Sequence, residues 1–404
     1  MKRFNFEAER KALIANRDYL KSLPVDEYTL RKKWDELQNK IYPDRLLVHV
    51  VRDGIWVPTD IMNEKQTVSE IEAMKPKVII ANDGDYKIWW DIFRLFASTA
   101  EYNQPPTRHI RFLVLDEARS ASWLRVYTPL VKGLQREPPG KVLGFGAISG
   151  DLPSIGCREK FIGWSKEQKH KMLPHHSAVG STIVPTQPFG TNCRGGKLIA
   201  ALATSALLRT QWQLQYDDIL VGMTTTSLYG RPSMYDGMRK WWKPVGDAVG
   251  AMPIQPDDAI YARWRNYVKK TYPKEFREAT QQEDGKRGPV TSETTRVLSL
   301  IFRVAGIPLN ECLHRHKRGV YYSCFYENSK EFLRGEITEN ALKMKPVFQD
   351  DTKAILDWWR PMAIAEYKKL KAKGKLKPEV LFYNHGYLED YETFKAHYLK
   401  DVGR

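Results

Sequence analysis

The pattern of hydrophobic positions changes its period along the chain and so separates helices from strands. Apolar residues recur at helical spacing in five segments, at residues 6–40, 86–100, 256–272, 293–305 and 338–371. Apolar runs of strand length lie between these segments, at residues 110–116, 141–149, 179–185, 219–226 and 319–326. This mixture predicts an α/β fold with a mixed central sheet, flanking helices, and helical extensions at both ends.

Three weaker signals complete the pattern. Residues 46–51 have the composition of a further strand. Ser165 is a favourable N-cap for a short helix over residues 165–171. The charged stretch 275–289 contains two glycines and predicts a loop.

Changes in composition predict four regions. An N-terminal helical and mixed region covers residues 1–87, and the α/β core covers 88–250. Residues 251–336 continue the core with helices and a strand, and residues 337–404 form a basic helical C-terminal region. A basic insertion at 117–140 interrupts the core.

The most informative stretch runs from residue 179 to residue 250. Its first strand, 179–185, leads through a loop to Gly195-Gly196-Lys197, which opens a helix. Glycines let the backbone approach a ligand, and the first turn of a helix presents N–H groups that have no partner inside the helix. We therefore predict an anion site here, of the kind that holds a phosphate.

Polar neighbours support this interpretation. Arg194 and Lys197 place positive charge beside the loop. Threonine and serine hydroxyls follow the next strand, at the end of α/β strands where ligands bind. The predicted cofactor-binding residues are Asn192, Arg194, Gly195, Gly196, Lys197, Thr225, Thr226 and Ser227.

Two other interpretations of the glycines stay open. A nucleotide-binding P-loop needs Lys directly after Gly195, with Ser or Thr next, whereas here Gly196 intervenes and Leu198 follows Lys197. This difference disfavours an NTPase. Alternatively, the glycines only allow the helix to pack closely against its strand.

The order of elements resembles that of GNAT-type acyltransferases. In those proteins the pyrophosphate of an acyl-coenzyme lies at a glycine loop, and its thioester arm lies between two splayed parallel strands. The resemblance implies that strands 179–185 and 219–226 form this pair and that the cofactor is an acyl-CoA-like, phosphate-bearing ligand. It also implies that Tyr235, on the next helix, is the catalytic acid, with Ser181 as the second candidate for handling the proton. The alternative places Tyr235 in the core.

The charge of the chain indicates an acidic partner. Lys and Arg number 64 against 48 Asp and Glu, which gives a net charge of +16, and nucleic acid, DNA above all, is the usual partner of such a surplus. Basic clusters are also often solvated faces without a partner. The predicted nucleic-acid-binding residues are Arg119, Arg125, Lys132 and Arg136 in the insertion and Lys368, Lys369, Lys371 and Lys373 near the C-terminus.

Several classes of protein are disfavoured. The four cysteines have no CxxC spacing and too few neighbouring histidines for a zinc site, so no metal is predicted. No apolar run reaches the roughly 18 residues of a membrane span, and the N-terminus is charged rather than apolar. These features predict a reduced, cytoplasmic protein that makes no membrane contact.

A family resemblance emerges from several short motifs taken together. They are Arg111-Phe112-Leu113-Val114, Leu143-Gly144-Phe145, Gly163-Trp164, Asn192 with Gly195-Gly196-Lys197-Leu198, and Thr224-Thr225-Thr226-Ser227 with Gly230, Ser233 and Tyr235. This series resembles the DruA proteins, which are components of the Druantia anti-phage defence system and have relatives among transposase-like proteins. The resemblance implies a role in defence, DNA as the target, and other defence subunits as partners, with a large helicase as one candidate.

Three hypotheses follow. In the first, the chain is a defence component that binds nucleic acid through a basic α/β domain. In the second, it is an acyltransferase-like enzyme that modifies DNA bases, and Arg194 to Lys197 bind the phosphate of its cofactor. In the third, it is a DNA-binding module associated with transposases and has no catalytic activity.

Overall fold

A computed structural model gives the structure of the chain. It describes residues 4–40, 54–95, 108–119, 140–227, 232–280, 293–349, 351–377, 391–393 and 395–396.

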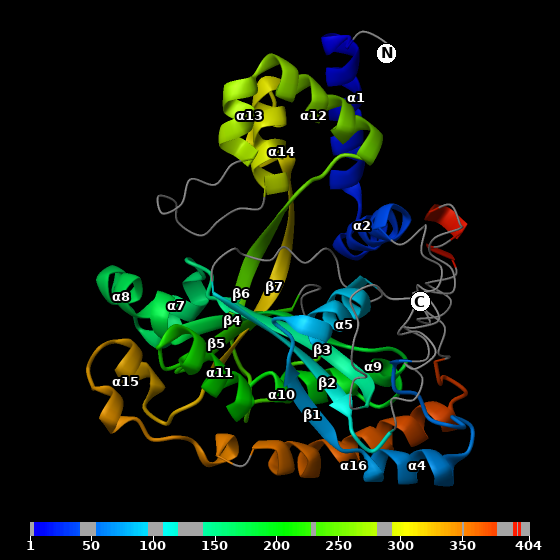
Figure 1. Cartoon of the computed structure of the whole chain (residues 1–404), viewed down its shortest axis with the longest axis vertical. Coiled ribbons are helices and arrows are strands. Elements are labelled where there is room, and N and C mark those ends of the chain that lie inside the picture. Colours follow the sequence, from blue (N-terminus) through cyan, green and yellow to red (C-terminus); the bar gives the residue numbers. More distant parts are fainter. Residues whose placement is uncertain are drawn as a thin grey trace.

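A seven-stranded mixed sheet forms the centre of the described structure (Figure 1). Its strands lie in the order β1-β2-β3-β4-β5-β7-β6. Every neighbouring pair is antiparallel except β4 and β5, which are parallel. The strands are β1 (Pro76–Ile80), β2 (His109–Asp116), β3 (Lys141–Gly150), β4 (Ser177–Pro185), β5 (Gly222–Thr226), β6 (Lys243–Pro253) and β7 (Leu313–Cys324). The predicted mixed sheet with flanking helices is confirmed.

The central strands are covered on both faces, which explains their continuous apolar runs. In β2 every residue after His109 is buried, and β3 is buried except at its two ends. Two glycines of β3 permit close packing: a Cβ atom on Gly144 would lie 2.6 Å from the Ile199 side chain, and one on Gly146 would lie 2.3 Å from the Phe112 ring. The sheet therefore accepts a helix directly against β3.

Helices pack around the sheet, and α10 lies against β3 and β4. The helix α16 (Asp351–Ala372) runs beneath the sheet in Figure 1, where it packs against α10 and α4. The other helices near the sheet are α4 (Glu64–Ala73), α5 (Gly84–Leu95), α7 (Gly156–Ile162), α8 (Lys166–His176), α9 (Phe189–Asn192), α10 (Gly195–Leu202), α11 (Ala206–Tyr216) and α15 (Ser329–Leu333). The short 3-10 helices are η2 (Leu309–Cys312), η3 (Glu339–Ala341) and η4 (Pro346–Phe348).

The strands β6 and β7 form a two-stranded ribbon that extends away from the sheet and carries helices at its far end (Figure 1). The chain between them folds into α12 (Asp258–Thr271), α13 (Pro273–Thr280) and α14 (Glu293–Val304), and α1 (Phe6–Ser22) packs against α12. We call these four helices the helical module. They share a hydrophobic core of their own, which includes Leu13, Trp264, Phe276 and Ile301. The helix α2 (Val25–Lys40) follows α1 and lies at the far end of the ribbon, where the Tyr28 hydroxyl donates to the carbonyl oxygen of Pro253.

The structure corrects the predicted loop 275–289 and confirms the predicted cap at Ser165. The first part of the predicted loop 275–289 belongs to α13, because Phe276 and Ala279 point one turn apart into the core of the helical module. Tertiary burial outweighs the high charge of this segment. Ser165 caps α8 as predicted, in a capping box with Gln168. The predicted strand 46–51 lies outside the described residues.

Candidate functional site at the fork between the parallel strands

The only parallel strand pair among the described residues separates after three residue pairs. Ser177 pairs with Gly222, Ala178 with Met223, and Val179 with Thr224. Beyond this point β4 pairs with β3 alone, and the last two residues of β5 pair with β7. The carboxyl halves of β4 and β5 therefore form a fork, at the edge of an α/β sheet where ligands bind.

A β-bulge places Ser181 at this fork. The register between β3 and β4 shifts so that Ala147 pairs with Thr182 and Ile148 with Gly180, which leaves Ser181 as the extra residue. Ser181 is the only exposed residue of β4. Its hydroxyl lies 3.1 Å from the carbonyl oxygen of Ala147 and 3.0 Å from the Ser149 hydroxyl. The bulge thus turns a hydroxyl outward where the strands part.

Tyr235 approaches the fork from the other face of the sheet. Tyr235 was predicted on a helix, but it lies in a series of turns. Backbone hydrogen bonds join Tyr235 to Met238 and Met238 to Trp242, and the side chains of Met238 and Trp242 are buried. The Tyr235 hydroxyl lies 3.1 Å from Thr225 Oγ1, which donates to the carbonyl oxygen of Gly180 on β4 (3.1 Å). Thr225 therefore joins the two arms of the fork. Burial raises the pKa of Tyr235, so that its phenol holds its proton.

The pairing of the strands shows that Ser181 and Tyr235 do not meet on one face. Val179 pairs with both Thr224 and Ser149, so these three side chains share a face, and the contact with Ser149 puts Ser181 there too. Thr225 points to the opposite face with Tyr235. The two predicted catalytic residues therefore flank the fork from opposite sides.

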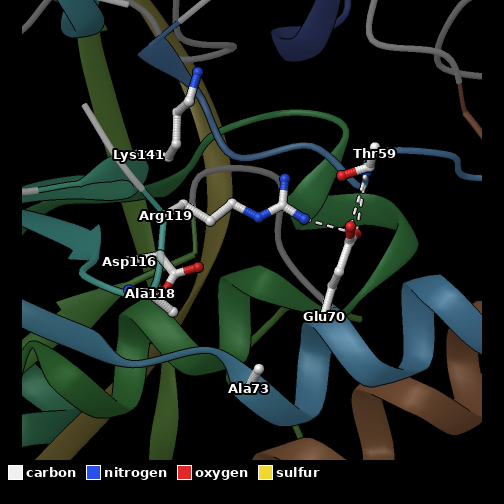
Figure 2. Close-up of a pocket in the computed structure, with 7 residues that line it drawn as sticks. All are labelled: Thr59, Glu70, Ala73, Asp116, Ala118, Arg119 and Lys141. Carbon is white, nitrogen blue, oxygen red and sulfur yellow. Dashed lines mark hydrogen bonds and ion pairs between the residues drawn. The ribbon is translucent and has the colours of Figure 1, made fainter. Parts of the chain in front are cut away.

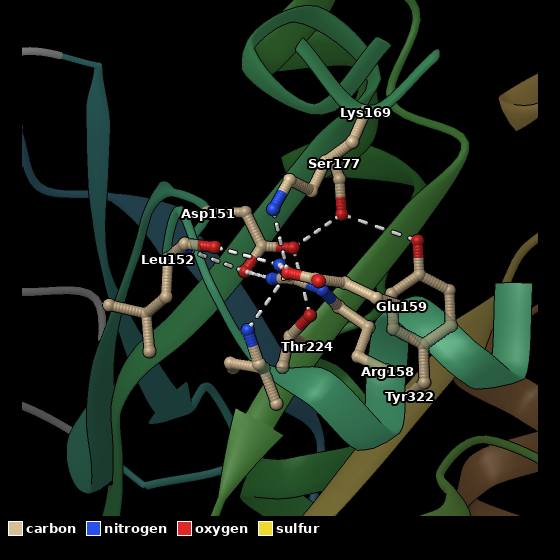
Figure 3. A network of polar contacts seen from close by, with 9 residues as sticks. Asp151, Leu152, Arg158, Glu159, Lys169, Ser177, Thr224 and Tyr322 are labelled. Carbon is tan, nitrogen blue, oxygen red and sulfur yellow. Dashed lines mark hydrogen bonds and ion pairs between the residues drawn. The ribbon is translucent and has the colours of Figure 1, made fainter. Parts of the chain in front are cut away.

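A buried polar network lies at the base of the fork (Figure 3). Asp151 and Arg158 are fully buried and form an ion pair of 2.7 Å. Ser177 of β4 and Thr224 of β5 donate hydroxyl hydrogen bonds to Asp151 Oδ2, at 2.5 and 2.8 Å. Burial raises the pKa of Asp151, although Arg158 and the two hydroxyls oppose the shift. The network fixes β4 to β5 just before the strands separate, and sequence reasoning missed it because its members are distant along the chain.

The glycine loop opens α10 as predicted, but the protein's own side chains fill the space beside it. A Cβ atom on Gly195 would lie 2.4 Å from the Phe189 ring, and one on Gly196 would lie 3.1 Å from Met234 Sδ. Both glycines are buried in a tightly packed layer. These contacts agree with the alternative in which the glycines allow close packing.

The two cations beside this loop contact acceptors of the chain itself. Arg194 binds Glu366 of α16, with Nε and one terminal nitrogen 2.8 and 2.5 Å from Oε2. Lys197 Nζ donates to the carbonyl oxygens of Met234 (2.9 Å) and Asp236. Burial and the neighbouring Arg194 lower the pKa of Lys197. The anion that Arg194 contacts in this structure is therefore a carboxylate of the C-terminal helix.

The other predicted cofactor-binding residues also have structural contacts. Asn192 exchanges two hydrogen bonds with the backbone of Lys377, at 2.9 and 3.0 Å. Ser227 and Gly319 exchange two further hydrogen bonds, which hold the end of β5 to β7. Thr226 is half-buried at the end of β5. A bound anion at the glycine loop stays a prediction, and the contacts around Thr225 and Thr226 bring those residues to the fork.

The predicted nucleic-acid-binding residues differ in their contacts. Arg119 pairs with Glu70 at 2.6 Å and stacks over Trp56, which makes it part of the fold. Arg125, Lys132 and Arg136 lie outside the described residues. Near the C-terminal end of α16, Lys368, Lys369 and Lys373 are exposed and Lys371 is half-buried. Lys368 and Lys371 lie 3.5 and 3.6 Å from Glu64, and Lys369 lies 3.5 Å from Glu366. Surface pairs of this length are weak, so these lysines can also contact a phosphate.

A separate pocket of about 340 Å³ lies between α4 and the ends of β2 and β3 (Figure 2). Its wall includes Glu70, Asp116, Arg119 and Lys141. Asp116 Oδ1 accepts from the backbone of Lys75 and Ala118, whereas Oδ2 is buried with no hydrogen-bond partner. Sequence reasoning missed this pocket as well, because α4 contributes to it from a different region of the chain.

The described residues contain no group of three or more His, Cys, Asp or Glu side chains placed to hold a metal ion. Within the same ranges, no helix combines the length and the apolar character that a membrane crossing requires.

Comparison with known proteins decides the family. The family described as "Druantia protein DruA" matches residues 134–335, half of the chain. The chain belongs to the DruA family. The matched region runs from just before β3 to just after α15 and so includes the fork, the β6–β7 ribbon and α12–α14 of the helical module.

One curated relative extends the likeness beyond that region. The Druantia protein DruA of Escherichia coli (strain UMEA 4076-1) is 24% identical over 306 residues, which cover 70% of this chain and 68% of the relative. No solved structure matches. Membership of the family implies a component of an anti-phage defence system, as the sequence motifs predicted.

Proposed function

We propose that this DruA-family chain binds DNA as its contribution to anti-phage defence, and that a basic, GNAT-like domain does so. The observation that carries the proposal is the net charge of +16 on a member of a defence family. Invading nucleic acid is the polyanion that a defence component meets, and excess positive charge attracts it at long range. We further propose other defence subunits as partners and the cytoplasm as the place of action.

The strand arrangement supports the GNAT-like part of the proposal. Among the described strands, β4 and β5 are the one parallel pair, and they separate after three residue pairs. The short helix α9 and then α10, which opens on Gly195, follow β4 at the end where the strands part. An acyl-coenzyme in this arrangement would place its arm in the fork.

We predict that the lysines of α16 form part of the DNA surface. Changing Lys368, Lys369, Lys371 and Lys373 to glutamine removes up to four phosphate contacts, so the slope of log affinity against log salt should become shallower by about 3 to 4. Fluorescence anisotropy with a labelled 20-base-pair duplex at several salt concentrations measures this slope. Glutamine replacement of four exposed lysines on other elements, Lys65, Lys166, Lys171 and Lys274, is the matched control. Equal effects of the two sets would mean that only the total charge matters.

A second candidate function is group transfer to a DNA base, and the geometry of the fork favours it. The exposed Ser181 hydroxyl and the protonated Tyr235 phenol flank the fork from opposite faces. A phenol that holds its proton can donate it to a leaving thiolate, although a raised pKa makes the phenol a weaker acid. In this function the cofactor would be an acyl-CoA-like ligand, with Gly180, Ser181 and Thr225 around its thioester end.

Tyr235→Phe separates the two functions. The substitution removes the hydroxyl that contacts Thr225 but keeps the ring that packs between Trp242 and Tyr321. For a transferase we expect product formation to fall by about a hundredfold or more while cofactor affinity changes little. Mass spectrometry of nucleosides from treated DNA measures the product. DNA binding that is the same in both proteins, with no product from the unaltered chain, would leave a binding module without catalysis.

A further inference from the structure

Arg318 of β7 is a half-buried cation that no carboxylate of the described residues neutralises. Its Nε donates to His316 Nε2 at 2.6 Å, and one terminal nitrogen lies 3.4 Å from Thr226 Oγ1. Among the described residues no Asp or Glu lies within ion-pair distance of its guanidinium. Burial lowers the pKa of Arg318, with no neighbouring negative charge to oppose the shift.

The surroundings hold the guanidinium in place. Gly250 pairs with His316 across the ribbon, and a Cβ atom there would lie 2.3 Å from Arg318 Nε and 2.9 Å from His316 Nε2. The missing side chain therefore makes room for the Arg318–His316 contact. Burial, and after it the positive charge of Arg318, lower the pKa of His316 to about 4. The ring is therefore neutral, and its Nε2 can accept the hydrogen bond.

The ring of His316 supplies a further unused donor. Because Nε2 accepts from Arg318, the proton of the neutral ring lies on Nδ1, and Nδ1 is buried without a hydrogen-bond partner. A buried donor without a hydrogen-bond partner and a half-buried cation without a carboxylate beside it each cost stability. An anionic acceptor bound at this residue pair would lower both costs.

The position of Arg318 relates it to the fork. Val320 pairs with Thr226, and Arg318 lies two residues before Val320 on the same face of β7. Thr224 and Thr226 share that face, as does Ser181 across the fork. Arg318 therefore stands beside the end of β5, on the side of the sheet where the exposed Ser181 hydroxyl lies.

We propose that Arg318, held over Gly250 by His316 and joined by the Thr226 hydroxyl, binds a phosphate group at the open end of the fork. A guanidinium with free terminal donors and a hydroxyl beside it form the usual set for a phosphate oxygen pair. The phosphate has two possible sources, the backbone of a DNA strand or a small phosphate-bearing ligand. The first source rests on the proposed DNA binding, and the second does not.

The test compares three variants of the full chain against two ligands. Arg318→Gln removes the guanidinium, and Gly250→Ala displaces it while every charge is kept. Arg315→Gln is the matched control, because Arg315 is an exposed arginine of the same strand whose side chain points to the other face of the ribbon. The ligands are a labelled single-stranded 20-mer, followed by anisotropy, and inorganic pyrophosphate, followed by calorimetry.

We expect Arg318→Gln and Gly250→Ala to weaken 20-mer binding about tenfold, the loss of one charged hydrogen-bonding contact, whereas Arg315→Gln changes it less than threefold. The salt slope should fall by about 0.9 in Arg318→Gln. Its melting temperature should stay the same or rise, because an unpaired buried charge is removed. If Arg318 only supported the fold, the melting temperature of Arg318→Gln would fall instead.

The two ligands separate the sources. Loss of pyrophosphate binding with unchanged 20-mer binding would assign the site to a small ligand. If the unaltered chain binds pyrophosphate through Arg318 but no DNA, the proposed function fails and the phosphate site stands. Binding of both ligands to Arg318→Gln with wild-type affinity, or equal losses in Arg315→Gln, would overturn the proposal, as would no binding of either ligand to the unaltered chain.

Discussion

Replacing Arg158 by alanine is expected to lower the free energy of unfolding by about 3 to 5 kcal/mol. Arg158 is fully buried and donates to Asp151 Oδ1 at 2.7 Å and to the carbonyl oxygen of Leu152 at 2.8 Å. The alanine variant leaves the Asp151 carboxylate buried with only the hydroxyls of Ser177 and Thr224 and the Leu152 backbone N–H as partners. Urea unfolding followed by circular dichroism measures the loss.

The double variant Asp151→Asn/Arg158→Ala is the control for this prediction. It removes both charges, so no uncompensated carboxylate remains, and the loss of stability should be smaller than in Arg158→Ala alone. A double variant that is at least as unstable as Arg158→Ala would show that lost packing, and not the buried charge, causes the effect.

The effect of Arg158→Ala should depend on pH. Burial already raises the pKa of Asp151 above its ordinary value of 3.8, and loss of the Arg158 charge raises it further. The folded state then binds more protons than the unfolded state between the two pKa values, so stability falls as pH rises through this window. The variant should therefore lose more stability at pH 8 than at pH 5, and the double variant should lose this pH dependence.

Replacing Trp264 by alanine is expected to cost about 3 to 5 kcal/mol and to act on the helical module. Trp264 is fully buried, its ring packs edge-on against Phe4 and Tyr267, and it belongs to the core formed by α1 and α12–α14. This core is separate from the one that covers the sheet. Hydrogen exchange should therefore show lost protection in α12–α14 while β2, β3 and α10 stay protected.

Trp212→Ala is the matched control, because Trp212 is equally buried in the core against the sheet. It should reduce protection around the sheet first. If both variants lose protection evenly across all described elements, the helical module and the sheet unfold as one unit.

Much of the sheet could be predicted because its strands are signalled locally. Buried strands such as β2 and β3 are apolar without interruption, and the capping box at Ser165 joins residues three positions apart. The glycines at the start of α10 and the threonines of β5 likewise indicated the fork, because glycines that open a helix and clustered hydroxyls at the end of a strand are each found in few structural settings. In contrast, β7 begins at Leu313, earlier than predicted, because its basic first half is paired with β6 and not buried.

The contacts that give the site its chemistry join residues far apart in the chain, and only the tertiary structure decided them. The amino-acid sequence determined the family, the mixed sheet and the excess of positive charge, since each depends on composition or on neighbouring residues. It placed positive charge at Arg194, but the fold brings Glu366 to that charge from 172 residues away. It contained nothing to single out Arg318, which is distinguished because no carboxylate in the described part of the chain lies beside its guanidinium. The pairing and burial of a charge depend on every element packed around the residue, and the local pattern of amino acids does not determine that packing.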